Sequence, residues 1–149
     1  MIQILKNYSF ELLPFKVHTD FLEYTLEEGE WGIVEVNPDT GELEFKCLDP
    51  DTKITAEQAV VAHLIVRGSN WYAKDPNWVE PGNYVSTLEK KRGLYLKTDK
   101  YLNVTGPTDL TLIGQANKGA VFTPATAGDP VIARCLAKLT TGEIIVILT

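Results

Sequence analysis

Residues that often carry chemistry are scarce in this chain of 149 residues, which contains two cysteines and two histidines. Cys47 and Cys135 lie far apart and neither belongs to a Cys-x-x-Cys pair, so a disulfide framework is excluded. We expect two reduced, partly buried thiols, because free cysteine behaves as a small apolar residue. Zinc needs three or four Cys, His or carboxylate ligands at workable spacing, and nothing in the sequence clusters that way. We therefore expect no metal and no cofactor.

The motifs of common enzyme classes are also missing. The chain has neither a Gly-x-Ser-x-Gly elbow nor a glycine-rich phosphate loop. His63 lies inside the apolar run Val60–Val66, where a hydrogen-bonded histidine within a strand is expected rather than a catalytic base. Asp49 and Asp51 lack the further oxygen ligands and the closing Glu of a calcium loop, so we interpret them as turn-forming acids. We predict that the protein is not an enzyme.

Targeting and membrane signals are absent as well. The chain begins without a basic leader followed by a long apolar run, and no stretch approaches the roughly 20 apolar residues of a membrane span. We expect synthesis in the cytoplasm and no membrane partner. A chain of this length fits one domain, and neither an internal repeat nor a low-complexity linker divides it, so we predict a single domain over residues 1–149.

Charge is distributed unevenly along the chain. Residues 1–60 hold thirteen acidic side chains against four basic ones, whereas residues 61–149 hold seven against ten, for an overall charge of −6. An acidic front half disfavours nucleic-acid binding, because contacts with phosphates need a basic face. The acidic residues form either a solvated surface or one side of a contact between subunits, in which an acidic front meets a basic back and steers assembly.

Turn and strand signals predict a mostly β fold. Trp31–Val36 and Leu43–Cys47 flank the turn residues 37–41 and form a β-hairpin. Thr55-Ala56-Glu57-Gln58 has the form of a capping box, which predicts one short helix before a strand over Val60–Val66. Further short strands are expected over Tyr84–Leu88, Gly93–Thr98, Tyr101–Thr105 and Leu110–Ile113. This spacing predicts a small antiparallel β-barrel or sandwich with at most one or two short helices.

The segment from Val121 to Leu148 has the pattern of three strands joined by a Gly128-Asp129 turn and a Gly142 turn. Its middle part predicts a strand with one buried apolar face. That face is formed by Val131, Ala133, Cys135, Ala137 and Leu139. Residues 144–148 are apolar throughout, which is typical of a strand covered on both faces.

The residues Thr126–Ala137 followed by Thr141–Leu148 resemble the closing strands of tailed-phage capsid decoration proteins, also called cement proteins. The resemblance is strongest over the last thirty residues. The matching positions are Gly128, Asp129, Val131, Leu136, Gly142, Ile144, Val146 and Leu148. The resemblance implies a β-tulip-like domain that forms a homotrimer, binds the major capsid protein on the outer capsid surface of the virion, and stabilises the shell after synthesis in the host bacterium. The chain departs from smaller members of this family in its long acidic front half.

The first ten residues are too apolar for a loose tail, since they include Ile2, Ile4, Leu5, Tyr8 and Phe10. They form either a first strand within the domain or an extended arm that gains order on a partner subunit by strand addition. Decoration proteins of phage heads often use an N-terminal arm in the second way. We therefore expect these five residues to contact the capsid or a neighbouring protomer.

A loop of about fifteen residues contains Trp71, Tyr72 and Trp78 together with several prolines. Three interpretations stay open: the rings pack within the fold, contact another subunit or the shell, or stack on a sugar. The last defines an alternative function, a lectin-like or receptor-adhesion domain that binds glycans through residues 71–78.

Overall fold

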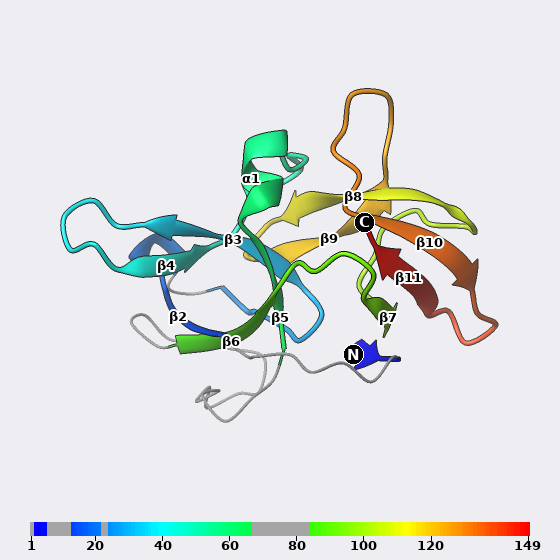
Figure 1. Ribbon diagram of the computed structural model, residues 1–149, viewed down its shortest axis with the longest axis horizontal. Coiled ribbons are helices and arrows are strands. Elements are labelled where there is room, and N and C mark those ends of the chain that lie inside the picture. Colours follow the sequence, from blue (N-terminus) through cyan, green and yellow to red (C-terminus); the bar gives the residue numbers. More distant parts are fainter. Residues whose placement is uncertain (1, 6–12, 22–23, 67–83) are drawn as a thin grey trace.

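The computed structural model describes residues 2–5, 13–21, 24–66 and 84–149. Within these ranges the chain is mostly β, with a single α-helix and a single 3-10 turn (Figure 1), as the sequence predicted. The strands are β1 (Ile2–Ile4), β2 (Leu13–Val17), β3 (Trp31–Val36), β4 (Leu43–Lys46), β5 (Ala62–Ile65), β6 (Tyr84–Glu89), β7 (Tyr95–Thr98), β8 (Thr108–Gln115), β9 (Lys118–Pro124), β10 (Ala133–Lys138) and β11 (Ile144–Leu148). The helix α1 spans Ala56–Val60 and the 3-10 turn η1 spans Thr19–Phe21.

Five strands close into a small barrel in the order β3, β4, β2, β6, β5 and back to β3. The pairing of β2 with β4 is parallel, whereas the other pairings in this ring are antiparallel. Alternate side chains of each strand point inward, and Val17, Phe45, Ile65 and Val85 form the buried cluster. A Cβ atom on Gly32 would lie 2.2 Å from the Phe45 ring, so the ring occupies space that only glycine leaves open.

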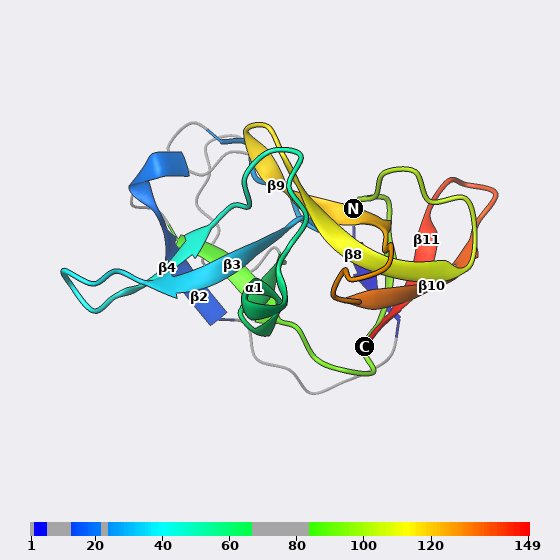
Figure 2. The same ribbon diagram turned by 90° about the horizontal axis from the view of Figure 1, so that it is seen from above.

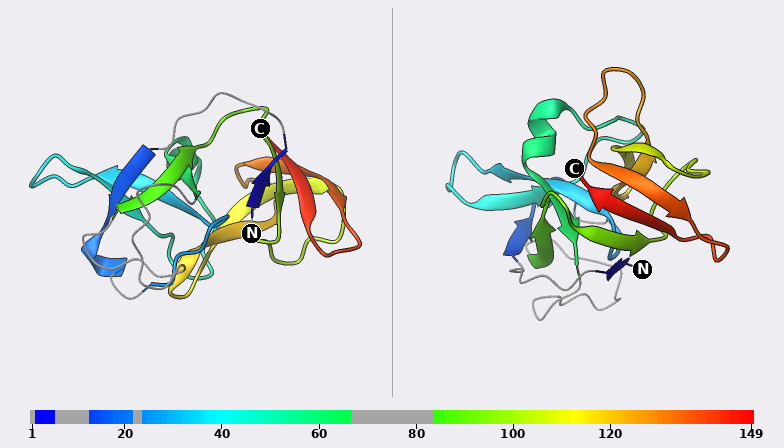
Figure 3. Two further views of the ribbon diagram at one scale, coloured as in Figure 1. Left: turned by 90° about the horizontal axis from the view of Figure 1, so that it is seen from below. Right: turned by 45° about the vertical axis from the view of Figure 1, so that its right-hand side comes forward.

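The remaining strands form a second sheet in the order β1, β7, β11, β10, β8, β9, with antiparallel neighbours throughout. It joins the barrel where Trp31 of β3 pairs with Ala120 of β9, and Figure 2 shows the two parts side by side. Figure 3 shows β1 lying against this sheet. The larger hydrophobic core fills the space between the sheet and the barrel, where the rings of Trp31 and Phe122 meet edge to face at 5.8 Å.

Local signals in the sequence located the hairpin and the helix. Strands β3 and β4 pair across the predicted turn, with Val36 opposite Leu43. The capping box is formed: Gln58 N donates to Thr55 Oγ1 at 3.2 Å, and Thr55 N donates to Gln58 Oε1 at 3.0 Å. The strand predicted from Val60 begins at Ala62, because the last residue of the helix is Val60.

Two details of the predicted strands are wrong. Tyr101–Thr105 forms an isolated bridge at Tyr101 instead of a strand, because Asn103 adopts a left-handed backbone with φ of 59° that interrupts extended chain. Strand β10 starts at Ala133, and before it Ile132 is buried whereas Val131 is exposed, the reverse of the predicted alternation. Ile132 N donates to Leu110 O, so the chain is already bonded to β8 one residue before β10 begins.

The last strand is covered on one face and half-covered on the other. Ile144, Val146 and Leu148 are buried in the core, whereas Ile145 and Ile147 are half-buried on the opposite face. The prediction that both faces are covered is therefore correct for one face only. The second face leaves part of its apolar surface in contact with solvent.

Candidate interaction surfaces

The start of the predicted N-terminal arm is a strand of the protein's own sheet. Ile2 pairs with Thr98 and Ile4 with Leu96, and both isoleucines pack against the larger core. Ile2 N donates to the Glu28 carboxylate at 3.3 Å. Leu5 is 42% exposed. Of the two alternatives for the arm, the structure shows the first for residues 2–4.

The other residues predicted to contact a partner lie outside the described part of the chain. These are Tyr8, Phe10, Trp71, Tyr72 and Trp78. Their role as contact residues stays a prediction. The described residues contribute two further surfaces that the sequence alone did not reveal, at opposite ends of the molecule.

The first surface is the far end of the β3–β4 hairpin, residues 35–44, which we call the acidic hairpin. It projects beyond the barrel (Figures 1 and 2). Val36 and Leu43 stand directly opposite each other and are 59% and 49% exposed, whereas the next pair inward on the same face, Val34 and Phe45, is buried. The apolar face of the hairpin therefore continues from the barrel interior into solvent.

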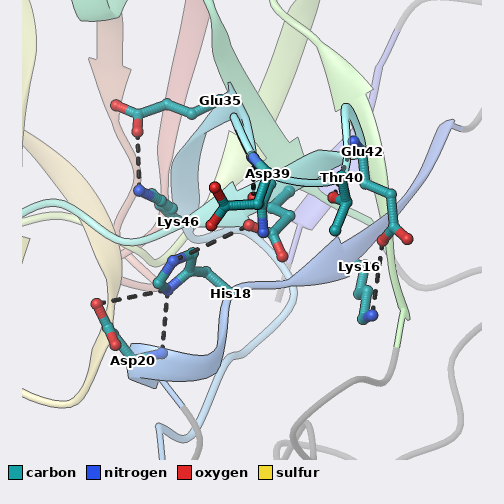
Figure 4. A network of polar contacts seen from close by, with 10 residues as sticks. Lys16, His18, Asp20, Glu35, Asp39, Thr40, Glu42 and Lys46 are labelled. Carbon is teal, nitrogen blue, oxygen red and sulfur yellow. Dashed lines mark hydrogen bonds and ion pairs between the residues drawn. The ribbon is translucent and has the colours of Figure 1, made fainter.

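Carboxylates occupy the other face and the turn of this hairpin, because Glu35, Glu42 and Glu44 alternate with Val36 and Leu43 along the two strands. Glu35 is bound to Lys46 at 2.9 Å, and Glu42 lies 3.5 Å from Lys16, as Figure 4 shows. Asp39 occupies the exposed turn, where its backbone N–H donates to the Asn37 side chain. Both ion pairs are partly exposed to solvent, so each adds little stability. With Glu44 included, the four acids outnumber the two lysines, and the surface is negative.

His18 lies at the base of this network. Its Nδ1 accepts a hydrogen bond from the backbone N–H of Asp20 at 3.0 Å, so the neutral ring carries its proton on Nε2. Nε2 lies 3.9 Å from the buried carboxylate of Glu44. Glu44 also stands directly opposite Glu35 in the β3–β4 register, an arrangement of like charges that costs stability unless cations are close. Lys46, which is paired with Glu35, is therefore part of the support for this acidic face.

The second surface is the solvent side of β1, β7, β11 and β10, which we call the outer sheet face. Ile147 lies between Tyr95 and Arg134, and Ile145 lies beside Lys97. Leu5 N donates to Tyr95 O, which places Leu5 at the edge of the same face. Apolar and basic side chains lie together on this face, whereas the charged side chains of the hairpin are mainly acidic.

A cluster of three cations borders the outer sheet face. Lys90, Lys91 and Arg92 occupy the connection between β6 and β7, which we call the basic turn. Gly93 N donates to Leu148 O at 2.8 Å, and Lys90 Nζ donates to the Thr149 carbonyl at 3.2 Å, so this turn lies beside the end of β11. Arg134 on the neighbouring strand pairs with Asp109 at 2.9 Å at the exposed surface.

The buried titratable groups have structural roles. Burial, with a smaller effect from the charge of Glu30, raises the pKa of Cys47 to about 12, so this thiol is not a nucleophile at neutral pH. Burial also lowers the pKa of His63. The Thr87 hydroxyl donates to Leu13 O at 2.9 Å, so it accepts from His63 Nδ1 at 3.1 Å. His63 is thus the hydrogen-bonded strand histidine that the sequence predicted.

Among the described residues, no group of three or more His, Cys, Asp or Glu side chains is placed to hold a metal ion. The described helices include none that is long and apolar enough to cross a membrane. The chain matches no protein-family model, no curated protein and no solved structure.

Proposed function

We propose that this protein is a virion structural protein of a tailed phage, which binds the outside of the capsid and stabilises the shell by bridging major capsid subunits. The observation that carries the proposal is the resemblance of residues 126–148 to the closing strands of capsid decoration proteins. The matched residues have definite roles here. Gly128 and Gly142 adopt φ of 92° and 95° in turns, where other residues are strained. Ile144, Val146 and Leu148 form one buried row of β11.

Asp129, another matched position, organises the turn before β10. Its carboxylate accepts hydrogen bonds from Thr126 N at 2.8 Å and Thr126 Oγ1 at 2.9 Å, and it binds Lys53 Nζ at 2.7 Å. Lys53 precedes helix α1, so the contact ties the closing strands to a distant part of the chain. The contact holds the start of the closing strands in place, which supports the proposal that this protein braces other subunits.

The proposed mechanism is mechanical and includes no chemical step. A homotrimer contacts several major capsid subunits at once, and many weak contacts add up through multivalency. We propose that Tyr8 and Phe10 of the arm and the aromatic residues of the 71–78 loop touch the shell, while Ile2 and Ile4 anchor the arm to its own sheet.

Co-sedimentation with matured shells tests the proposal. Because Ile2–Ile4 belong to the protein's own sheet, removing residues 1–10 would also damage the fold. We therefore compare the intact chain with two substituted chains, Tyr8→Ala/Phe10→Ala and Trp71→Ala/Trp78→Ala. We expect the intact chain to pellet with shells and at least one of the variants to pellet less. Val60→Ser, at an 83% exposed site on α1, is the matched control and should bind like the intact chain.

Failure of the intact chain to pellet rules out the proposal. In that case tryptophan fluorescence distinguishes the lectin-like alternative, since an oligosaccharide that binds residues 71–78 changes the emission and Trp78→Ala abolishes the change. Light scattering on the purified protein gives a second check. A stable trimer is expected for a lattice brace, with three times the 16.6 kDa mass of the chain.

A further inference from the structure

We propose that copies of this chain associate head to tail, with the acidic hairpin of one protomer docked on the outer sheet face and basic turn of the next. This inference rests on the proposed function only for the expectation of a homotrimer. The occupant of each surface is a second copy of the chain, because the chain itself carries both halves of the contact.

The first argument is the exposed apolar surface at each site. Val36 and Leu43 form a cross-strand pair beyond the end of the barrel, and each side chain is more than two-fifths exposed. Ile145, Ile147 and Leu5 present half-buried or exposed apolar surface on the second sheet. Burying apolar surface stabilises association by about 25 cal/mol per Å², so both surfaces gain by being covered.

The second argument is charge. The hairpin carries Glu35 and Glu42 on the face opposite its apolar pair, and Asp39 at its turn. The receiving surface carries Lys97 among its apolar residues and is bordered by the basic turn, and its Arg134 is already paired with Asp109. Opposite potentials steer two copies into this orientation, whereas hairpin-to-hairpin contact places like charges together. The charge pattern therefore favours a contact between unlike surfaces over a symmetric one.

The third argument is position. In the view along the shortest axis, the hairpin lies at one end of the long axis and strands β10 and β11 lie at the other (Figure 1). One molecule can therefore use both surfaces at once. A contact between two different surfaces produces a ring if the rotation closes and a filament if it does not. In a closed ring of three, every hairpin is docked and every outer sheet face is covered.

The experiment uses two variants of the full chain, each defective in one surface. Val36→Ser/Leu43→Ser/Asp39→Lys changes the hairpin, and Lys91→Glu/Arg92→Glu changes the basic turn. All five side chains are exposed, so circular dichroism and the melting temperature should stay close to those of the unmodified chain. Light scattering should show that each variant alone is weakened in self-association. The protein concentration at which its trimer gives way to monomer should be at least about tenfold higher than for the unmodified chain.

Mixing the two variants tests the direction of the contact. The turn variant keeps an intact hairpin, and the hairpin variant keeps an intact receiving surface. The hairpin of the first can therefore dock on the receiving surface of the second. The two remaining surfaces of that pair are both defective. We therefore expect a 1:1 complex that does not grow, which a symmetric contact cannot produce. Val60→Ser, exposed but outside both surfaces, should leave the trimer intact.

Other results overturn the inference. These are a monomeric unmodified chain, variants that keep the trimer mass, and a mixture that stays monomeric or grows beyond two chains. If the hairpin variant keeps its mass and loses shell binding, the hairpin contacts the capsid protein instead. Shell binding by the unmodified chain without a trimer removes this inference and leaves the proposed function standing, so the two failures are distinguishable.

Discussion

Oε1 of Glu30 lies 3.0 Å from the backbone nitrogen of Gly119, and this hydrogen bond joins the residue before β3 to the start of β9. The same oxygen accepts from Glu27 N at 3.0 Å, and the residue is 1% exposed. A buried carboxylate with two backbone donors is well satisfied. It fastens the barrel to the second sheet at a position close to the Trp31–Ala120 pairing.

The close approach at Gly119 predicts that this site does not tolerate a side chain. A Cβ atom added there would lie 2.6 Å from Cβ of Glu30, which cannot swing away. We expect Gly119→Ala to lower the free energy of unfolding by about 1–3 kcal/mol, measured by urea denaturation. Gly106→Ala is the control, because no atom in the described part of the chain lies within 4 Å of its added Cβ, and it should change stability little. Equal effects of the two substitutions would contradict the prediction.

The environment of Glu30 predicts a pH dependence. Burial raises the pKa of Glu30 above its usual 4.5, although its two backbone donors and Lys100 act in the opposite direction. The folded state therefore binds the proton more tightly than the unfolded state, so the contribution of Glu30 to stability falls as pH rises from 4.5 through the raised pKa. Glu30→Gln keeps an acceptor oxygen and removes the charge. We expect the stability of Glu30→Gln relative to the unmodified chain to increase over that pH range.

Asp129 predicts the opposite dependence. Hydrogen bonds from Lys53 and then from Thr126 lower the pKa of Asp129 to about 2. Its contribution to stability is present above the ordinary pKa of 3.8 and is lost as pH falls toward 2. Asp129→Asn should lower the melting temperature at pH 7, and the difference from the unmodified chain should shrink in acid. Asp109→Asn, at the more exposed Arg134 pair, is the control and should have a smaller effect at both pH values.

Two buried threonines form a matched pair for a further prediction. Thr87 Oγ1 donates to Leu13 O and accepts from His63, whereas Thr111 Oγ1 has no partner among the described residues, and both residues are fully buried. Removing a buried donor leaves its partners unsatisfied, so Thr87→Val should destabilise the protein by about 1–3 kcal/mol. Thr111→Val removes a polar atom that makes no bond, and it should be neutral or stabilising. Chemical denaturation of the two variants gives the comparison directly, and a larger loss from Thr111→Val would refute it.

Much of the fold could be predicted from local signals in the sequence. The hairpin, the capping box and the turns at Gly128 and Gly142 are each specified by residues within a few positions of one another. The sequence also marked His63 as a strand residue, because the apolar run around it left no polar face. Alternation failed just before β10, where Ile132 is bonded to Leu110 and buried whereas Val131 is exposed.

The candidate surfaces were harder to predict. Alternation along β3 places Val34 and Val36 on one face, but it does not show that the barrel ends between them. The uneven charge of the two halves indicated an acidic side and a basic side. Which residues form those sides depends on pairings such as Ile145 with Lys97, which join distant segments.

By itself, the sequence determined the β-rich character of the chain, its tight turns, the buried thiols and the imbalance of charge, because these follow from residue type and near neighbours. The tertiary structure alone decided the closure of the barrel through the parallel β2–β4 pair, the hydrogen bond between Glu30 and Gly119, and the exposure of Val36 and Leu43. Each of these depends on where chain segments meet in space, and contacts between distant residues leave no periodic pattern in a single sequence.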